Sequence, residues 1–206
     1  MSLFQKNYPP EIAGRIPPGQ RLVKSWPVLH YGGIPRFDGA NWDLTVSGLV
    51  EEPFTLTYGE LRDLPHVTVD ADMHCVTGWT TLDNTWEGVS FRTIVDRAKP
   101  LPAAKWVISQ APGYSADLSL QAMLDDDVLL AWRNHGEDLS DEHGWPLRLV
   151  VPKRYAWKST KWLTGLEFTA ENRRGFWEIR GYHVHAEPFA EERYAHQEHA
   201  RAELEP

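Results

Sequence analysis

The chain has 206 residues, of which 42% are hydrophobic and 24% are charged, and its formal net charge is −8 at pH 7. This length and apolar fraction predict one domain, residues 1–206, with a sizeable core. The negative charge argues against nucleic acid or an anionic membrane as a general partner. No apolar run in the sequence reaches the roughly 20 residues that a membrane-spanning helix needs.

The first 40 residues are rich in proline and glycine and show little periodicity. They predict an extended arm, residues 1–40, that wraps the domain without forming regular structure. The first twenty residues contain neither a hydrophobic signal core nor a twin-arginine pair, so we expect a cytoplasmic protein.

Regular structure is predicted from residue 41 onward. In the stretch 41–50, Trp42, Leu44 and Val46 alternate with polar residues, as in a strand with one buried face. Thr57 and Glu60 then form a capping-box pattern, which predicts a short helix.

The stretch "HVTVDADMHC", residues 66–75, also alternates and predicts a strand. Cys75 ends its apolar face, whereas His74 belongs to the polar face. Because neighbouring residues in a strand point to opposite faces, we expect the two side chains to point apart.

Short helices and further strands complete the chain. Ser90 and Ser119 are expected N-caps of two helices. Strand-like runs follow at 105–110, 127–132, 147–152 and 161–170. Because strands outnumber the short helices and do not alternate regularly with them, the prediction is an α+β fold with a mixed or largely antiparallel β-sheet. The polar residues 186–206, with six glutamates, predict a solvated helix or a frayed tail.

Cys75 is the only cysteine, so an intramolecular disulfide is excluded. Three interpretations stay open for it. It is a small buried hydrophobe, a nucleophile, or a thiolate metal ligand whose other ligands come from a cofactor.

The stretch "PLRLVVPKRYAWKSTKWLTGL", residues 146–166, contains five basic residues and no acidic residue. Arginine and lysine beside serine and threonine hydroxyls are the groups that proteins use to hold a phosphate. The alternative is a strand, loop and strand with solvated lysines. The tryptophans at 157 and 162 favour a site, because they would pack the loop against the domain.

Two other polar clusters are weaker candidates for a metal site. His183 and His185, with His196 and His199, have spacings that zinc sites use, but such pairs are common by chance and favour solvated side chains here. The run Asp125 to Asp127 is typical of a solvated turn.

Taken together, the collinear stretches "HYGG", "HCVTGWTTLDNTWEGVSFRTIV", "ISQAPGYSADLSL", "EHGWPLR", "KSTKWLTGLEF" and "GFWEIRGYH" resemble the molybdopterin-binding domain of the sulfite oxidase superfamily. The resemblance covers about residues 25–185. It implies a molybdenum centre in which Cys75 is a metal ligand and catalytic residue, with a pyranopterin dithiolene supplying the other sulfurs.

The resemblance also implies a set of cofactor-binding residues. Charge adds Lys158 to it, and Ser109 or Gln110 lies near a further contact. His74, Thr77 and Trp79 would shape the surroundings of the metal ligand. The predicted cofactor-binding residues are His30, Tyr31, His143, Arg148, Lys158, Ser159, Thr160 and Lys161.

The chain departs from the sulfite-oxidising members of this family, which follow the metal cysteine with an arginine-rich segment. Here Val76 to Trp79 follow Cys75, and the next arginine is Arg92, so sulfite is disfavoured as the substrate. The pattern is similar to the bacterial branch that includes methionine-sulfoxide reductase. The expected activity is a two-electron oxygen-atom transfer on a small oxo compound or oxidised sulfur group, with a separate electron donor or acceptor. The alternatives are a non-catalytic molybdopterin or anion carrier and a cysteine-dependent hydrolase.

Overall fold

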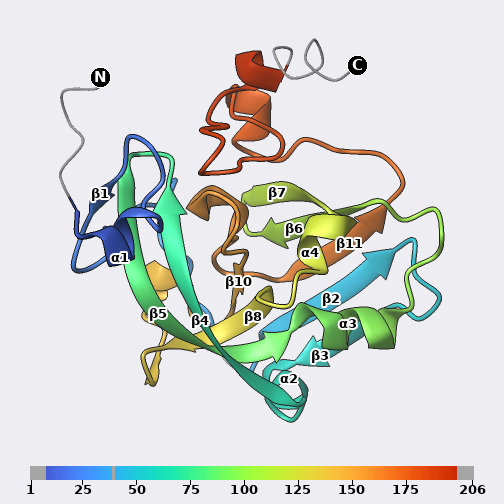
Figure 1. Ribbon diagram of the computed structural model, residues 1–206. Coiled ribbons are helices and arrows are strands. Elements are labelled where there is room, and N and C mark those ends of the chain that lie inside the picture. Colours follow the sequence, from blue (N-terminus) through green and yellow to red (C-terminus); the bar gives the residue numbers. More distant parts are fainter. Residues whose placement is uncertain (1–7, 39, 199–206) are drawn as a thin grey trace.

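The computed structural model describes residues 8–38 and 40–198. Its helices are short, and its strands form two sheets (Figure 1). The helices and 3-10 turns are α1 (Pro10–Ala13), α2 (Tyr58–Arg62), α3 (Phe91–Ala98), α4 (Leu120–Met123), η1 (Asp141–His143), η2 (Ala156–Lys158), η3 (Glu178–Arg180) and η4 (Ala195–Gln197). The strands are β1 (Arg21–Leu22), β2 (Asp43–Gly48), β3 (Phe54–Thr57), β4 (His66–Cys75), β5 (Trp79–Ser90), β6 (Trp106–Ala111), β7 (Tyr114–Ser119), β8 (Leu129–Asn134), β9 (Glu137–Asp138), β10 (Arg148–Val150) and β11 (Gly165–Thr169).

The six-stranded sheet has the order β1-β5-β8-β10, with β4 paired to β5 and β9 paired to β8. The five-stranded sheet has the order β3-β2-β11-β6-β7. The pairs β1 with β5 and β2 with β11 are parallel, and the other strand pairs are antiparallel. The predicted α+β class with a mixed, largely antiparallel arrangement is therefore confirmed.

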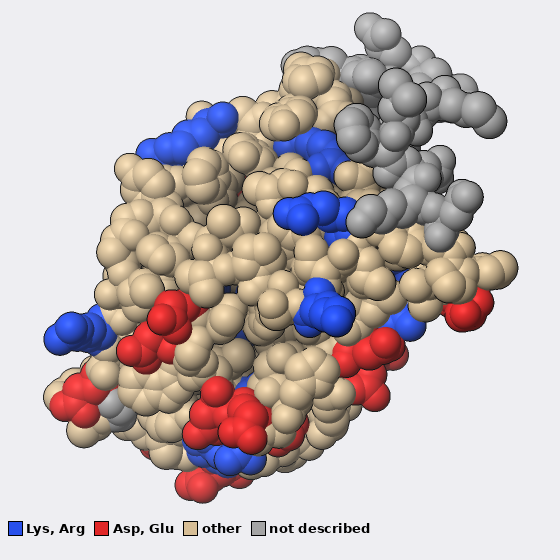
Figure 2. Space-filling view, turned by 90° about the vertical axis from the view of Figure 1, so that its left-hand side faces the viewer, with Lys and Arg blue, Asp and Glu red and all other residues tan. Residues whose placement is uncertain are grey.

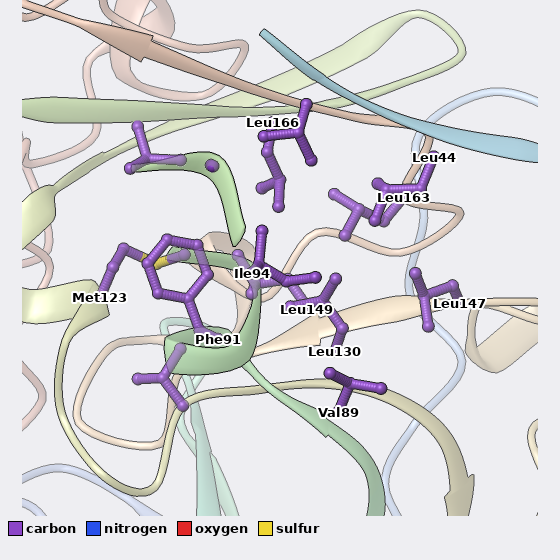
Figure 3. Packing of buried hydrophobic residues seen from close by; sticks show 14 of the residues in the cluster. Leu44, Val89, Phe91, Ile94, Met123, Leu130, Leu147, Leu149, Leu163 and Leu166 are labelled. Carbon is purple, nitrogen blue, oxygen red and sulfur yellow. The ribbon is translucent and has the colours of Figure 1, made fainter. Parts of the chain in front are cut away.

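The main core lies between the two sheets and under α3. Phe91 and Ile94 of α3 meet Leu130 and Leu149 of the first sheet and Leu166 of the second sheet, and all five side chains are buried (Figure 3). Burying one such side chain contributes about 1.5–3 kcal/mol, so this cluster fixes the two sheets against each other.

The predicted helix starts are confirmed in detail. Thr57 and Glu60 form the capping box of α2, and the Ser90 hydroxyl accepts a hydrogen bond from the Arg92 amide at the start of α3. Ser119 likewise accepts from the Ala122 amide at α4. These side chains satisfy amide groups that the first turn of a helix leaves without partners.

The expected irregular arm contains regular structure that the sequence did not reveal. Helix α1 lies within it, and β1 pairs in parallel with β5, with Arg21 opposite Trp79. The arm is therefore attached beside the turn that follows Cys75.

The expected solvated tail is also partly wrong. Ala186 and Glu192 are buried, and Tyr182 forms a β-bridge with Tyr194. Arg193 reaches the β4–β5 hairpin, where it donates to the Val76 carbonyl at 2.6 Å. Residues 186–198 thus pack on the domain, and residues 199–206 lie outside the described part.

Charge is dispersed on the face that carries β1 and the hairpin. In Figure 2 most acidic side chains lie in the lower half of this face, and Lys and Arg side chains are scattered over it as separate spots. The described Lys and Arg side chains of this face do not join into one patch. No described helix is long and apolar enough to cross a membrane.

Candidate cofactor site

A cavity of about 320 Å³ opens beside the end of β4 and brings together segments that are far apart in sequence. This volume falls in the range of sites that bind small molecules and cofactors. The lining comes from the arm, the β4–β5 hairpin, the turn before β7, the segment from η1 to β10, the stretch after η2 and the segment around η3. It includes Trp26, Leu29, His30, Tyr31, Cys75, Val76, Thr77, Tyr114, His143, Arg148, Ser159, Thr160, Lys161, Trp162, Trp177 and Tyr182.

Cys75 is 8% exposed and lies at the end of β4, next to this cavity. The strand pairs Cys75 with Trp79, so only three residues, Val76 to Gly78, form the hairpin loop. Gly78 has a φ of +89°, a backbone conformation that three-residue hairpin loops place on glycine. Burial raises the pKa of the Cys75 thiol, and hydrogen bonds from Thr77 oppose that rise.

His74 points away from Cys75, as the strand alternation predicts. Its side chain lines a different cavity, beside Asp70 and Phe189, and its Nδ1 lies 2.9 Å from the Thr80 hydroxyl. Burial lowers the pKa of His74 to about 4. This histidine is therefore not placed to remove a proton from the Cys75 thiol.

Arg148, at the start of β10, is the most deeply buried cation of the cavity, with 3% of its surface exposed. Its guanidinium donates to the carbonyls of His143 and Ser159 and lies near the rings of Trp26 and Trp86. No carboxylate of the described residues pairs with it, and its buried Nε lacks a partner. Burial lowers the pKa of Arg148 to about 9. A buried unpaired cation of this kind favours an anionic ligand.

Lys161 lies next to Arg148, because the two residues form an antiparallel bridge. Its Nζ donates to the carbonyls of Leu29 and Glu142 and lies 4.6 Å from the Trp162 ring centre. Burial, reinforced by the charge of Arg148, lowers the pKa of Lys161 to about 7. Like Arg148, it forms no ion pair among the described side chains.

His143 stacks on Trp26 with ring centres 4.4 Å apart. Its Nδ1 lies 3.0 Å from the Ser140 hydroxyl, which leaves the buried Nε2 without a partner. Burial lowers the pKa of His143, so the neutral ring is favoured. The neutral ring can donate or accept one hydrogen bond at Nε2, depending on its tautomer.

Ser159 and Thr160 line the cavity from the stretch after η2. The Ser159 hydroxyl accepts from the Val151 amide, and the Thr160 hydroxyl lies 2.7 Å from that of Ser109. Ser109 therefore supports Thr160 from behind and is not part of the lining. Gln110 donates to Glu167 and does not line the cavity either.

The arm covers one side of the cavity with His30 and Tyr31. His30 meets the edge of Trp162 at 6.0 Å between ring centres, and Tyr31 lies 4.7 Å from the ring centre of Phe176. Tyr31 remains 65% exposed, so it lies at the rim.

Lys158 does not lie where its charge led us to expect. It is 1% exposed, it is not part of the cavity lining, and its Nζ lies 3.0 Å from Asp117 Oδ1 and 2.6 Å from Glu178 Oε1. Two buried carboxylates already compensate its charge. We therefore remove Lys158 from the proposed cofactor-binding residues.

Four aromatic residues of the lining were not expected from the sequence, whereas Tyr31, Trp79, Trp157 and Trp162 were. Trp26 lies in the arm, Tyr114 at the start of β7, and Trp177 and Tyr182 around η3. The last two lie within the stretch "GFWEIRGYH", whose aromatic density was the available signal.

The histidines and aspartates that suggested other metals do not gather into a site. No group of three or more His, Cys, Asp or Glu side chains among residues 8–38 and 40–198 is arranged to hold a metal ion. His199 lies outside these ranges. Asp125 and Asp126 pair with Lys153 and Arg92 at the surface.

Residues 31–177 match the family described as oxidoreductase molybdopterin binding domain. The chain belongs to this family. As a molybdopterin-binding domain of the sulfite oxidase superfamily, it uses molybdopterin as its cofactor, and the predicted family and cofactor are confirmed.

Three similar proteins place the domain in context. It is 42% identical to an uncharacterized oxidoreductase of Bacillus subtilis, YuiH, over 93% of this chain and 98% of that protein. It is 30% identical to the catalytic subunit MsrP of the Campylobacter jejuni protein-methionine-sulfoxide reductase, over 69% of this chain and 54% of MsrP. The solved structure of the sulfane dehydrogenase SoxCD from Paracoccus pantotrophus matches 69% of this chain and 41% of its own, with a TM-score of 0.64 and 25% identity.

The residues of the cavity fit molybdopterin. A phosphate favours cations whose charge no carboxylate compensates, and among the described residues neither Arg148 nor Lys161 forms an ion pair. A pterin ring offers hydrogen-bonding edges, and the buried His143 Nε2 and Arg148 Nε have no partners. Molybdenum favours a sulfur ligand, and Cys75 lies on the same cavity.

Proposed function

We propose that this oxidoreductase catalyses a two-electron oxygen-atom transfer of the sulfite oxidase type, with Cys75 as the protein ligand of molybdenum. The observation that carries the proposal is the buried guanidinium of Arg148, which no carboxylate of the described residues pairs with and which lines the same cavity as the only cysteine. An unpaired buried cation is costly, and an anionic cofactor would compensate that cost.

Different residues of the cavity would bind the pterin cofactor and its metal. Arg148 and Lys161 would hold the phosphate, while His143, Ser159 and Thr160 would offer hydrogen bonds to the pterin. Cys75 must lose its proton to bind the metal, because the thiolate is the ligand form. The bound cofactor would supply the two-electron redox chemistry, and the protein would fix and shield it.

The substrate is proposed to be a small oxide in which oxygen is bound to sulfur or nitrogen. Among the described residues of the lining, the Lys and Arg side chains are Arg148 and Lys161, and both are assigned to the phosphate. Thr77, Trp177 and Tyr182 of the lining are aromatic or weakly polar. The cation that acts on the Cys75 thiol, Arg193, lies outside the lining and donates to the Val76 carbonyl. Such a lining favours an uncharged oxide over sulfite. MsrP, by its name, belongs to a methionine-sulfoxide reductase, which also supports this substrate class.

In the reducing direction the oxide would take up two electrons and two protons and release the reduced compound and water. In the opposite direction water would supply the oxygen, and two electrons would leave the protein. A separate protein or small carrier would exchange these electrons. We propose the cytoplasm as the compartment, which cell fractionation would test.

The cysteine-dependent hydrolase is the weaker alternative. Burial raises the pKa of Cys75, and His74 lines a different cavity, so the thiol has neither a low pKa nor that histidine as a base.

The proposal is tested with molybdenum-loaded protein from a host that makes the pterin. The protein is reduced without oxygen and mixed with a sulfoxide or an N-oxide, and in parallel the oxidised protein is mixed with sulfite. We expect stoichiometric reoxidation by at least one oxide, together with the deoxygenated product. Loaded protein whose oxidation state no oxide or reductant changes would be a non-catalytic carrier, which contradicts the proposal.

A further inference from the structure

The hydroxyl group of Thr77 donates a hydrogen bond to Sγ of Cys75 at 3.2 Å. A hydrogen bond of this kind stabilises negative charge on the sulfur. Cys75 and Met73 supply the only sulfur atoms in the described lining of this cavity, and Met73 offers a thioether and not a thiolate.

The loop that carries Thr77 has little freedom. It has three residues between the paired Cys75 and Trp79, and the Gly78 amide donates to the Cys75 carbonyl at 2.9 Å. This return of the chain sets Thr77 directly beside Cys75.

Three groups from outside the hairpin hold the loop carbonyls. Gln20 Nε2 donates to the Cys75 carbonyl at 3.0 Å, and the Arg21 amide donates to the Gly78 carbonyl at 2.9 Å. From the C-terminal segment, Arg193 donates to the Val76 carbonyl at 2.6 Å and also to the Pro18 carbonyl at 3.2 Å. The segment that ends in β1, the strand paired with β5, and the segment after η3 therefore both fix this loop. These contacts hold the Thr77 hydroxyl next to the Cys75 sulfur.

We propose that Thr77 is a positioning residue that orients the Cys75 thiolate toward the metal and reduces its electron donation through the hydroxyl hydrogen bond. This inference rests on the proposed role of Cys75 as the molybdenum ligand. A hydrogen bond to a ligating sulfur withdraws electron density from it, which favours the reduced metal and raises the reduction potential.

The test uses loaded protein and the variants Thr77→Val, Thr77→Ser and Thr68→Val. Valine has nearly the shape of threonine but no hydroxyl donor, whereas serine keeps the donor. Thr68 is exposed on β4, the strand that ends at Cys75, and serves as the matched control. The measurements are molybdenum per chain, the energy of the absorption band from sulfur to molybdenum, and the reduction potential of the metal.

We expect Thr77→Val to shift the band to lower energy and to change the ratio of oxidised to reduced metal about tenfold toward the oxidised form. For a two-electron couple this is a decrease of about 30 mV. Thr77→Ser and Thr68→Val should match the wild type. If Thr77→Val loads no molybdenum while Thr77→Ser loads normally with the wild-type band, the positioning role is also supported.

A Thr77→Val protein with the wild-type band and potential would overturn the inference, as would a Thr77→Ser protein that behaves like Thr77→Val. Those two results would leave Cys75 as the metal ligand, whereas other results would contradict the proposed function itself. Wild-type protein without molybdenum, or a Cys75→Ser protein that keeps the wild-type sulfur band, would remove the premise itself.

Discussion

The ammonium group of Lys158 lies 2.6 Å from Glu178 Oε1 and 3.0 Å from Asp117 Oδ1, and all three side chains are buried. Trp157 adds a hydrogen bond to Glu178, whose pKa burial raises. We predict that Lys158→Met lowers the free energy of unfolding by roughly 3–5 kcal/mol, because it leaves two buried carboxylates without their cation. Urea denaturation measures this change. Lys153→Met, at an exposed pair with Asp125, is the control and should cost less than about 1 kcal/mol. Equal losses in the two variants would contradict the prediction.

Arg148→Met should change the stability of the protein little and its cofactor content strongly. In cofactor-free protein the variant loses two hydrogen bonds to carbonyls but also removes an unpaired buried cation. We therefore expect a change in unfolding free energy below roughly 2 kcal/mol, together with at least about a tenfold loss of bound pterin and molybdenum. Arg148→Lys keeps the charge but not the fork-shaped donors, and it should retain only part of the cofactor. Normal cofactor content in Arg148→Met would contradict the assignment.

Lys161 predicts a pH-dependent affinity for anions. Its pKa of about 7 in the folded protein lies below the value of about 10.4 for an unperturbed lysine. Between these values the unfolded chain binds more protons, so the contribution of Lys161 to stability rises with pH in that window. Anion binding has the opposite dependence, since it needs the charged lysine.

Sulfate is a suitable probe because its charge does not change near neutrality. We expect cofactor-free protein to bind sulfate more tightly at pH 6 than at pH 8, measured by calorimetry. The Lys161→Arg variant should bind sulfate with the same affinity at pH 6 and at pH 8, because arginine stays charged. Arg148, Glu142 and His143 also act near this site, and the arginine variant separates their titration from that of Lys161. A wild-type affinity that is equal at both pH values would contradict the prediction.

Gly144 allows the backbone of η1 to approach both cations of the cavity. Its φ is +111°, and a Cβ at this position would lie 3.1 Å from Lys161 Cβ and 3.2 Å from Arg148 Cβ. Gly144→Ala should cost about 1–3 kcal/mol of stability and lower the cofactor content, because both cations must shift. Gly136→Ala, at φ +79° with no atom within 4 Å, is the control for backbone strain alone. Unchanged cofactor content in Gly144→Ala would contradict this account.

Local patterns predicted much of the fold because short-range chemistry determines them. The strand at 66–75 and the caps at Thr57, Ser90 and Ser119 follow from alternation and from hydroxyl groups near helix starts. The pairing of β1 with β5 did not follow, because it depends on contacts across more than 50 residues. The packing of the C-terminal segment includes contacts such as that of Arg193 with the Val76 carbonyl, 117 residues earlier, and composition cannot reveal such contacts.

The cavity was predictable where charge and family motifs agreed. Cys75, Arg148 and Lys161 lie on one cavity, as expected. Lys158 was misassigned because sequence cannot distinguish a cation that faces a ligand from one that faces buried carboxylates. Asp117 lies 41 residues before Lys158, on β7, so no local pattern shows this pairing.

The central claim is that Cys75 binds the metal while Arg148 and Lys161 hold the phosphate of its pterin cofactor. It is tested most directly by the molybdenum content and absorption spectrum of the wild type and of Cys75→Ser, both made in one pterin-competent host. The account predicts stoichiometric molybdenum in the wild type, and its loss or an altered spectrum in Cys75→Ser. Wild-type protein that stays free of molybdenum, while a known molybdoenzyme from the same cells is loaded, would contradict it.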